Sequence, residues 1–220
     1  MAESGQAKKT RAARILARLV RAYPTAGIEL RFGNALELLA ATILSAQCTD
    51  ERVNAVTSTL FQRYRTAEDW ARAEPATLEK EIHSTGFFKA KARSLMGMGQ
   101  ALVERHGGEV PRTLAELVEL PGVGRKTANV VLGNAFGISA LAVDTHVTRV
   151  SQRLGFTRAD DAEKIHDELC ALLPRPKWIQ ATHLLIIHGR RTCHARKPEC
   201  PRCPVLALCP WPDKTRSERG

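Results

Sequence analysis

The stretch Leu120-Pro-Gly-Val-Gly-Arg-Lys-Thr-Ala-Asn129 decides the architecture of this chain. Pro121 ends a preceding helix, because a proline pushes the residue before it out of the helical region. Gly122 and Gly124 allow the backbone to turn sharply and to come close to a ligand. A second helix begins at once, and its free N–H groups form a positively polarised end that suits an anion. The pattern predicts two helices over about residues 114–136 whose connecting turn grips a phosphate, with a plain interhelical turn as the alternative.

Helical periodicity extends from this hairpin over nearly the whole chain. Thr113 and Glu116 form a capping-box pattern at the start of one apolar stripe, and Gly155 ends a later one. Strand-like alternation is scarce. The predicted helical stripes cover residues 114–120, 143–154, 161–173 and 178–188. The fold class predicted from these patterns is all-α.

The charge of the chain points to a polyanion as partner. Its 220 residues include 33 Lys and Arg against 23 Asp and Glu, which gives a formal net charge of +10. Basic residues follow a Gly86-Phe87-Phe88 sequence at Lys89, Lys91 and Arg93, and we interpret them as surface charge beside a functional loop. This distribution favours nucleic acid, although the excess could also serve only solubility.

The sequence predicts a cytoplasmic protein without a membrane segment. Residues 1–5 lack the apolar stretch of a signal peptide, and the apolar runs 36–46 and 130–143 are too short to span a bilayer. Residues 8–22 are basic like a transit peptide, but Leu16 and Leu19 fall on one face of an ordinary first helix. We expect the helix.

Four cysteines near the C-terminus follow a C-x6-C-x2-C-x5-C spacing. Such thiolates can ligate zinc or a [4Fe–4S] cluster, and two disulfides are a third option that needs an oxidising compartment. Zinc loops usually pair two short knuckles, whereas only one is present here, so the spacing favours the [4Fe–4S] cluster. The predicted ligands are Cys193, Cys200, Cys203 and Cys209.

Several of these motifs together carry a family resemblance. Residues Leu120–Asn129 resemble the helix-hairpin-helix motif of the DNA glycosylase superfamily. The sequences Leu44-Ser-Ala-Gln-Cys-Thr-Asp50 and Val143-Asp-Thr-His146, together with the cysteine loop, resemble the endonuclease III family. The resemblance runs from about Lys8 to Cys209 in the family's order.

This resemblance implies a two-domain all-α fold with a DNA groove between the domains. A six-helix barrel would cover residues 28–138, and residues 1–27 would join residues 139–220 in a second domain with an iron–sulfur loop at 193–209. The family flips a damaged nucleotide out of double-stranded DNA, as base chemistry demands. We expect a monomer in which the cluster serves structure, while a redox-sensing role stays open.

The resemblance also assigns the catalytic and DNA-binding positions. Lys126 would be the nucleophile, favoured as the free amine by the helix end and by partial burial, and Asp144 would assist it and support a cationic sugar. The remaining implied DNA contacts are Gln47, Phe87, Gly122, Val123, Gly124, Arg125, Thr127, His146, Arg196 and Lys197.

Some of these positions have simpler interpretations. Lys126 could contact only a phosphate, and Asp144 is expected to cap a helix in addition to any catalysis. His146 could be a structural histidine, Phe87 a core residue, and Cys48 an inert buried thiol.

The resemblance implies a bifunctional DNA N-glycosylase and AP lyase of base-excision repair that acts on oxidised pyrimidines and abasic sites. A mismatch-adenine glycosylase of the same fold is one alternative, but that branch lacks the hairpin lysine. A non-catalytic helix-hairpin-helix DNA-binding module is the other, and the presence of both Lys126 and Asp144 argues against it.

Overall fold

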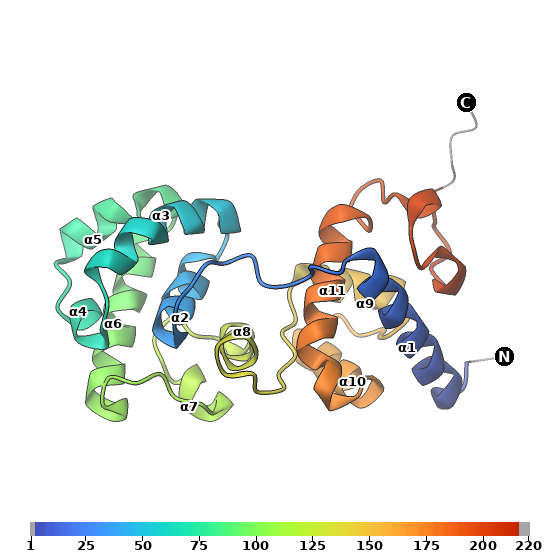
Figure 1. The fold of residues 1–220 in the computed structure, drawn as a ribbon, viewed down its shortest axis with the longest axis horizontal. Helices are drawn as coiled ribbons and strands as arrows, with labels where there is room; N and C mark the ends of the chain where they lie inside the picture. Colours follow the sequence, from blue (N-terminus) through green and yellow to red (C-terminus); the bar gives the residue numbers. More distant parts are fainter. Residues whose placement is uncertain (1–2, 216–220) are drawn as a thin grey trace. The chain divides into compact units, whose positions relative to one another are not determined.

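The computed structural model describes residues 3–215, which contain helices and connecting loops but no strand. The predicted all-α class is confirmed. The chain divides into two compact units: unit 1 comprises Met1–Ile28 and Ser139–Gly220, and unit 2 comprises Glu29–Ile138. Figure 1 shows the helices of each unit in sequence colours, with the N-terminal helix in blue. None of the helices within residues 3–215 combines the length and the apolar character that a membrane span requires.

Unit 2 is built around an apolar helix, α2 (Ala35–Leu44). Every residue from Leu38 to Leu44 is buried, as expected for a helix that is hydrophobic on all sides. The other elements of unit 2 are α3 (Asp50–Arg63), α4 (Ala67–Ala71), α5 (Pro75–Glu81), η1 (His83–Thr85), α6 (Phe88–His106), α7 (Leu114–Val118) and α8 (Arg125–Phe136). Helix α2 packs against three helices that follow it in the chain, α3, α6 and α8, the last of which is the second helix of the hairpin.

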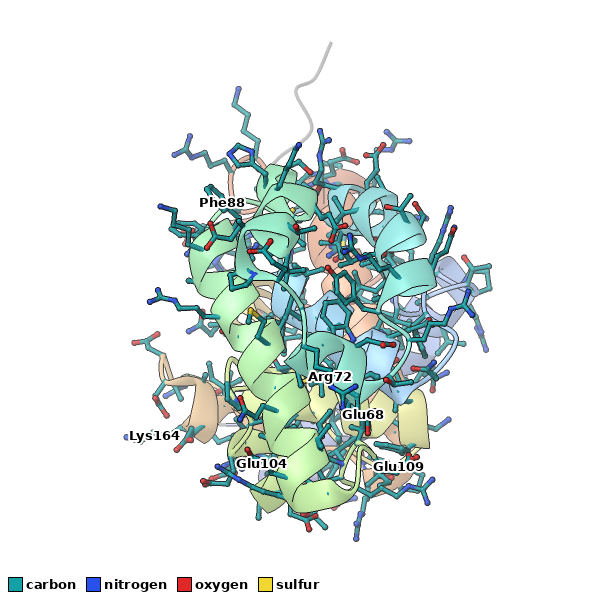
Figure 2. All side chains as sticks on the ribbon, turned by 90° about the vertical axis from the view of Figure 1, so that its left-hand side faces the viewer. Glu68, Arg72, Phe88, Glu104, Glu109 and Lys164 are labelled. Carbon is teal, nitrogen blue, oxygen red and sulfur yellow. The ribbon has the colours of Figure 1, made fainter. Side chains whose placement is uncertain are left out.

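Helices α4 and α6 approach each other closely in unit 2. A side chain added at Gly99 of α6 would place its Cβ 2.6 Å from Trp70 Cβ and 2.7 Å from Ala67 O on α4. Figure 2 looks along this face, with Phe88 marking the first turn of α6 and Glu104 its C-terminal part. The absence of a side chain at Gly99 therefore permits this close approach of α6 to α4.

Unit 1 surrounds a second apolar core. Its helices are α1 (Gly5–Ala22), α9 (Thr145–Arg153), α10 (Ala162–Leu172) and α11 (Trp178–Arg191), followed by the 3-10 turns η3 (Cys200–Arg202) and η4 (Leu206–Leu208). A further turn, η2 (Arg175–Lys177), precedes α11. The core side chains include Leu19, Phe156, Leu169, Leu184 and Val205. The core thus joins α1 to elements more than a hundred residues away in sequence.

The helices predicted at residues 143–154, 161–173 and 178–188 are confirmed, as is the helix over residues 8–22. Gly155 takes a left-handed φ of 65° after α9, as expected at that position. The reciprocal capping box at Thr113 is wrong in one detail. Thr113 Oγ1 accepts from Glu116 N at 3.3 Å, but Glu116 accepts from the Thr113 hydroxyl instead of reaching the cap backbone.

Candidate functional site

The hairpin of unit 2 joins α7 to α8 through a tight turn. Val123 N donates to Leu120 O at 3.0 Å, and both side chains are buried beneath the turn. Gly122 has a φ of 78°, and a Cβ there would lie 2.6 Å from Ser94 Cβ. The predicted need for glycine is therefore confirmed at Gly122. Because Val123 is buried, only its backbone can contact a ligand.

Gly124 has a different role from the one predicted. Its φ of −91° and ψ of 174° are ordinary extended values, so the turn does not require a glycine there. A Cβ added at Gly124 would meet nothing within 4 Å, which means that it would point into open space. Gly124 is the N-cap of α8 and provides no side-chain cap. The missing side chain leaves the first N–H groups of α8 accessible from outside.

Lys126 is the second residue of α8 and is exposed. The predicted partial burial is therefore absent from the free protein. Arg125 beside it is also exposed, whereas Thr127 is half-buried. The amine thus stands at a helix N-terminus, open to solvent and to a ligand.

Two turns of unit 2 carry non-glycine residues in left-handed conformations. Gln47, after α2, has a φ of 52°, and Phe87, before α6, has a φ of 49°. Gln47 is exposed, and Phe87 is 66% exposed, which is unusual for a large apolar side chain. The core interpretation of Phe87 is therefore wrong. Cys48 is half-buried beside Gln47.

The basic residues after Phe88 divide into two kinds. Lys89 and Arg93 are exposed, as the sequence predicted. Lys91 is only 5% exposed, so its interpretation as surface charge is wrong. Its Nζ donates to Leu44 O and to Thr85 O, each at 2.8 Å. No local pattern signals this, because the Leu44 contact spans 47 residues.

In unit 1, Asp144 begins α9 as the sequence predicts. Its Oδ1 accepts from Val147 N at 2.8 Å, and the side chain is half-buried. Asp144 belongs to unit 1, whereas Lys126 belongs to unit 2.

His146 follows Asp144 in the first turn of α9. Its Nδ1 lies 3.1 Å from Arg149 Nη2, which also donates to Gly189 O at 3.0 Å. Burial lowers the pKa of His146, Asp144 opposes that change, and Arg149 and Arg190 reinforce it. The contacts fit the structural interpretation of this histidine, while its predicted contact with DNA stays a prediction.

The four predicted cysteine ligands line one pocket of unit 1 together with His188. All four are free thiols. Burial raises the pKa of Cys203 to about 11 and raises that of Cys209 as well. A metal centre would reverse this preference, because it binds thiolates and drives their deprotonation. The fit to a thiolate-ligated centre rests on the donor type, since all four thiols line the same pocket. Within residues 3–215, no three His, Cys, Asp or Glu side chains converge on a position for one metal ion.

Side chains from α9 and α11 surround this pocket. Arg153, at the end of α9, donates to His194 O at 2.7 Å and to Ala195 O at 3.0 Å, and it stacks on the Trp211 ring. His188 is fully buried, and its Nε2 lies 3.7 Å from Cys203 Sγ. Burial lowers the pKa of His188 to about 4. The loop is therefore held by groups from two helices.

Arg196 and Lys197 are exposed within the same loop, as predicted. Lys197 has a left-handed φ of 49°, which marks a tight turn at the loop surface. Both cations are thus available to a partner.

Comparisons with known proteins give a consistent result. Residues 40–175 match the family model described as HhH-GPD superfamily base excision DNA repair protein. Endonuclease III of Synechocystis sp. is 52% identical over 92% of this chain and 93% of its own length. Two solved structures, a non-covalent endonuclease III–DNA complex and a trapped endonuclease III–DNA covalent intermediate, each superpose with a TM-score of 0.88 at 46% identity, covering 92% of this chain and 95% of theirs.

Proposed function

The chain belongs to the endonuclease III family of base-excision DNA repair proteins and is a DNA glycosylase and AP lyase, and we propose how its own residues perform these steps. The observation that carries the proposal is Lys126, an exposed amine at the start of α8 in the hairpin. One solved relative is a covalent protein–DNA intermediate, which supports a covalent route.

In the proposed reaction, the neutral Lys126 amine attacks C1′ of the damaged nucleotide. The base leaves with the electrons of its glycosidic bond and takes up a proton. The nitrogen of Lys126 then forms a Schiff base with the opened sugar. Loss of a C2′ proton expels the 3′ phosphate by β-elimination, and water finally releases the lysine. The products are a free base and a nicked strand.

Asp144 supports the electron-poor sugar in this proposal. A carboxylate stabilises the positive charge that develops as the base leaves. Its bond to Val147 N fixes the orientation of the carboxylate, so capping and catalysis use the same side chain.

We propose that the bound DNA is a duplex with an oxidised pyrimidine or an abasic site, and that the protein acts as a monomer. The open backbone of Gly122 and Gly124 would hold a phosphate at the start of α8. Exposed Gln47 would fill the space of the flipped nucleotide, and exposed Phe87 would wedge against the opposite strand. Arg196 and Lys197 would contact further phosphates.

We further propose that Cys193, Cys200, Cys203 and Cys209 hold a [4Fe–4S] cluster. When bound, such a cluster would fix the loop that carries Arg196 and Lys197. Cys203→Ser should lose visible absorbance and bound iron and should destabilise unit 1. Cys48→Ala, in unit 2, should retain both. Equal iron content in the two variants would contradict the ligand assignment.

Borohydride trapping on abasic DNA tests the catalytic proposal. The wild type and Cys48→Ala should give a covalent adduct, and Lys126→Ala should give none. A wild type that forms no adduct would refute the covalent route. Parallel glycosylase assays on thymine-glycol duplexes and on A·8-oxoguanine duplexes should show activity on the first. Activity on the second alone would support the mismatch-adenine alternative.

A further inference from the structure

Lys91 is buried, whereas the other lysines of unit 2 are exposed, namely Lys80, Lys89 and Lys126. It lies in the first turn of α6 and is 5% exposed. Burial of an ammonium group is unfavourable unless its donors are satisfied. Burial accordingly lowers the pKa of Lys91, and Cys48 opposes that change. An apolar residue at this position would avoid the cost, so the contacts of the ammonium group call for an explanation.

The two acceptors of Lys91 belong to two separate turns. Leu44 is the last residue of α2, and its carbonyl is one of those that a helix end leaves without an internal partner. Thr85 is the last residue of η1, directly before Gly86 and Phe87. The backbone N–H of Lys91 also donates to Phe87 O at 3.0 Å. One residue therefore binds the main chain beside both turns.

Both turns are held in conformations that their residues rarely adopt. Gln47, three residues after Leu44, and Phe87, two residues after Thr85, have positive φ angles. Non-glycine residues keep such angles only where surrounding contacts impose them. Both side chains are exposed, so their own packing contributes little of that restraint. The hydrogen bonds of Lys91 are a restraint common to the two turns.

We propose that Lys91 is a positioning residue that fixes the turns of Gln47 and Phe87 relative to each other for entry into DNA. The inference rests on the proposed DNA roles of those two side chains. A duplex that must be unstacked resists a loosely held wedge, because the wedge has to be in place when the base leaves the stack. Because its Nζ is buried and bonded to two carbonyl groups of unit 2, Lys91 would act through the turns and not on the substrate itself.

The test separates base extrusion from the later chemistry. Lys91→Met removes the ammonium donors and keeps an unbranched chain of similar length, and Lys91→Gln keeps one donor group. Lys80→Met is the matched control, because Lys80 is an exposed lysine in the last turn of α5. Single-turnover base removal is measured on a thymine-glycol duplex, and strand cutting is measured on an abasic duplex. A 2-aminopurine opposite the lesion reports unstacking by fluorescence.

Lys91→Met should slow base removal about tenfold or more and reduce the fluorescence change, since each tenfold corresponds to about 1.4 kcal/mol. Strand cutting at the abasic site, which has no base to extrude, should slow less than about threefold. Lys91→Gln should fall between Lys91→Met and the wild type, and Lys80→Met should match the wild type.

Three results would overturn the proposal: equal losses in both steps, unchanged base removal, or failure of both Lys91 variants to fold by circular dichroism. The variants Gln47→Ala and Phe87→Ala distinguish a failure of the Lys91 proposal from a failure of the DNA roles proposed for the two turns. If those two variants leave the fluorescence change intact, the roles of the turns are wrong. If they abolish it while Lys91→Met does not, only the positioning role is wrong.

Discussion

Helices α8 and α9 begin at the two proposed catalytic positions, and they begin in different ways. The first N–H groups of α9 face their own protein, since Asp144 Oδ1 accepts from Val147 N at 2.8 Å. Those of α8 have no side-chain acceptor from their N-cap, because that residue is Gly124. One helix end is closed by a carboxylate, and the other is left open.

The difference separates two uses of the same backbone chemistry. Every helix N-terminus offers unpaired donors and a partial positive charge. In α9 the donors bind a carboxylate of the chain and so fix its direction. In α8 the donors stay accessible, which suits the phosphate contact proposed for the hairpin. Substitution of the α9 N-cap, Asp144, should therefore change how the carboxylate is held, whereas substitution of the α8 N-cap, Gly124, should change DNA binding.

Lys126→Ala should have the largest effect. We expect the AP lyase rate to fall on the order of a thousandfold or more, as when other covalent nucleophiles are removed. The backbone donors of α8 remain, so DNA affinity should fall by less than about tenfold. Gel-shift and single-turnover assays measure the two quantities. A similar loss in both would mean that Lys126 serves mainly as a phosphate contact.

Asp144→Asn should follow in size. Asparagine is as good an N-cap as aspartate, so the free energy of unfolding should change by less than about 0.5 kcal/mol. The loss of the charge should slow base removal roughly a hundredfold.

Asp144→Ala is the companion variant, because it removes the cap as well. It should cost about 1 kcal/mol of stability in addition to the activity. Urea denaturation of the two variants supplies the comparison. Stability losses of equal size would show that the cap does not depend on the side-chain oxygen, which asparagine retains and alanine lacks.

Substitutions of the two hairpin glycines should differ in kind. Gly122→Ala forces a Cβ against Ser94 at a φ of 78° and should destabilise unit 2 by roughly 1–3 kcal/mol. Gly124→Ala meets no atom within 4 Å, so the only expected cost is that of a poorer N-cap, at most about 1 kcal/mol. Its Cβ would instead stand beside the open donors and weaken DNA binding several-fold. Intact binding by Gly124→Ala would argue against a phosphate at this helix end.

The smallest expected effect is on the salt dependence of DNA affinity. The backbone donors of α8 are uncharged, so Gly124→Ala should leave the slope of log affinity against log salt unchanged. Lys197→Ala should reduce that slope by about 0.9, the value for one neutralised phosphate. Binding isotherms over a salt series decide this. An unchanged slope for Lys197→Ala would exclude its phosphate contact.

Local signals in the sequence predicted the all-α class and the start of α9, because caps, turn glycines and apolar periodicity act within a few residues. The DNA-contacting position that the family resemblance implies for Phe87 agrees with its 66% exposure, whereas two adjacent phenylalanines by themselves also allow a core. The burial of Lys91 had no local signal at all. Its partners are carbonyl groups, which every residue carries, and one of them lies 47 residues away.

Helix α9 has a mechanical consequence for unit 1. Asp144 caps its first turn, and Arg153 at its other end, about 13 Å along a rigid rod, donates to the main chain of the cysteine loop. A short helix cannot bend to absorb a shift at one end. Rearrangement of the cysteine loop would therefore change the orientation of the Asp144 carboxylate at the other end of α9. Damage to that loop would slow the reaction before unit 1 unfolds.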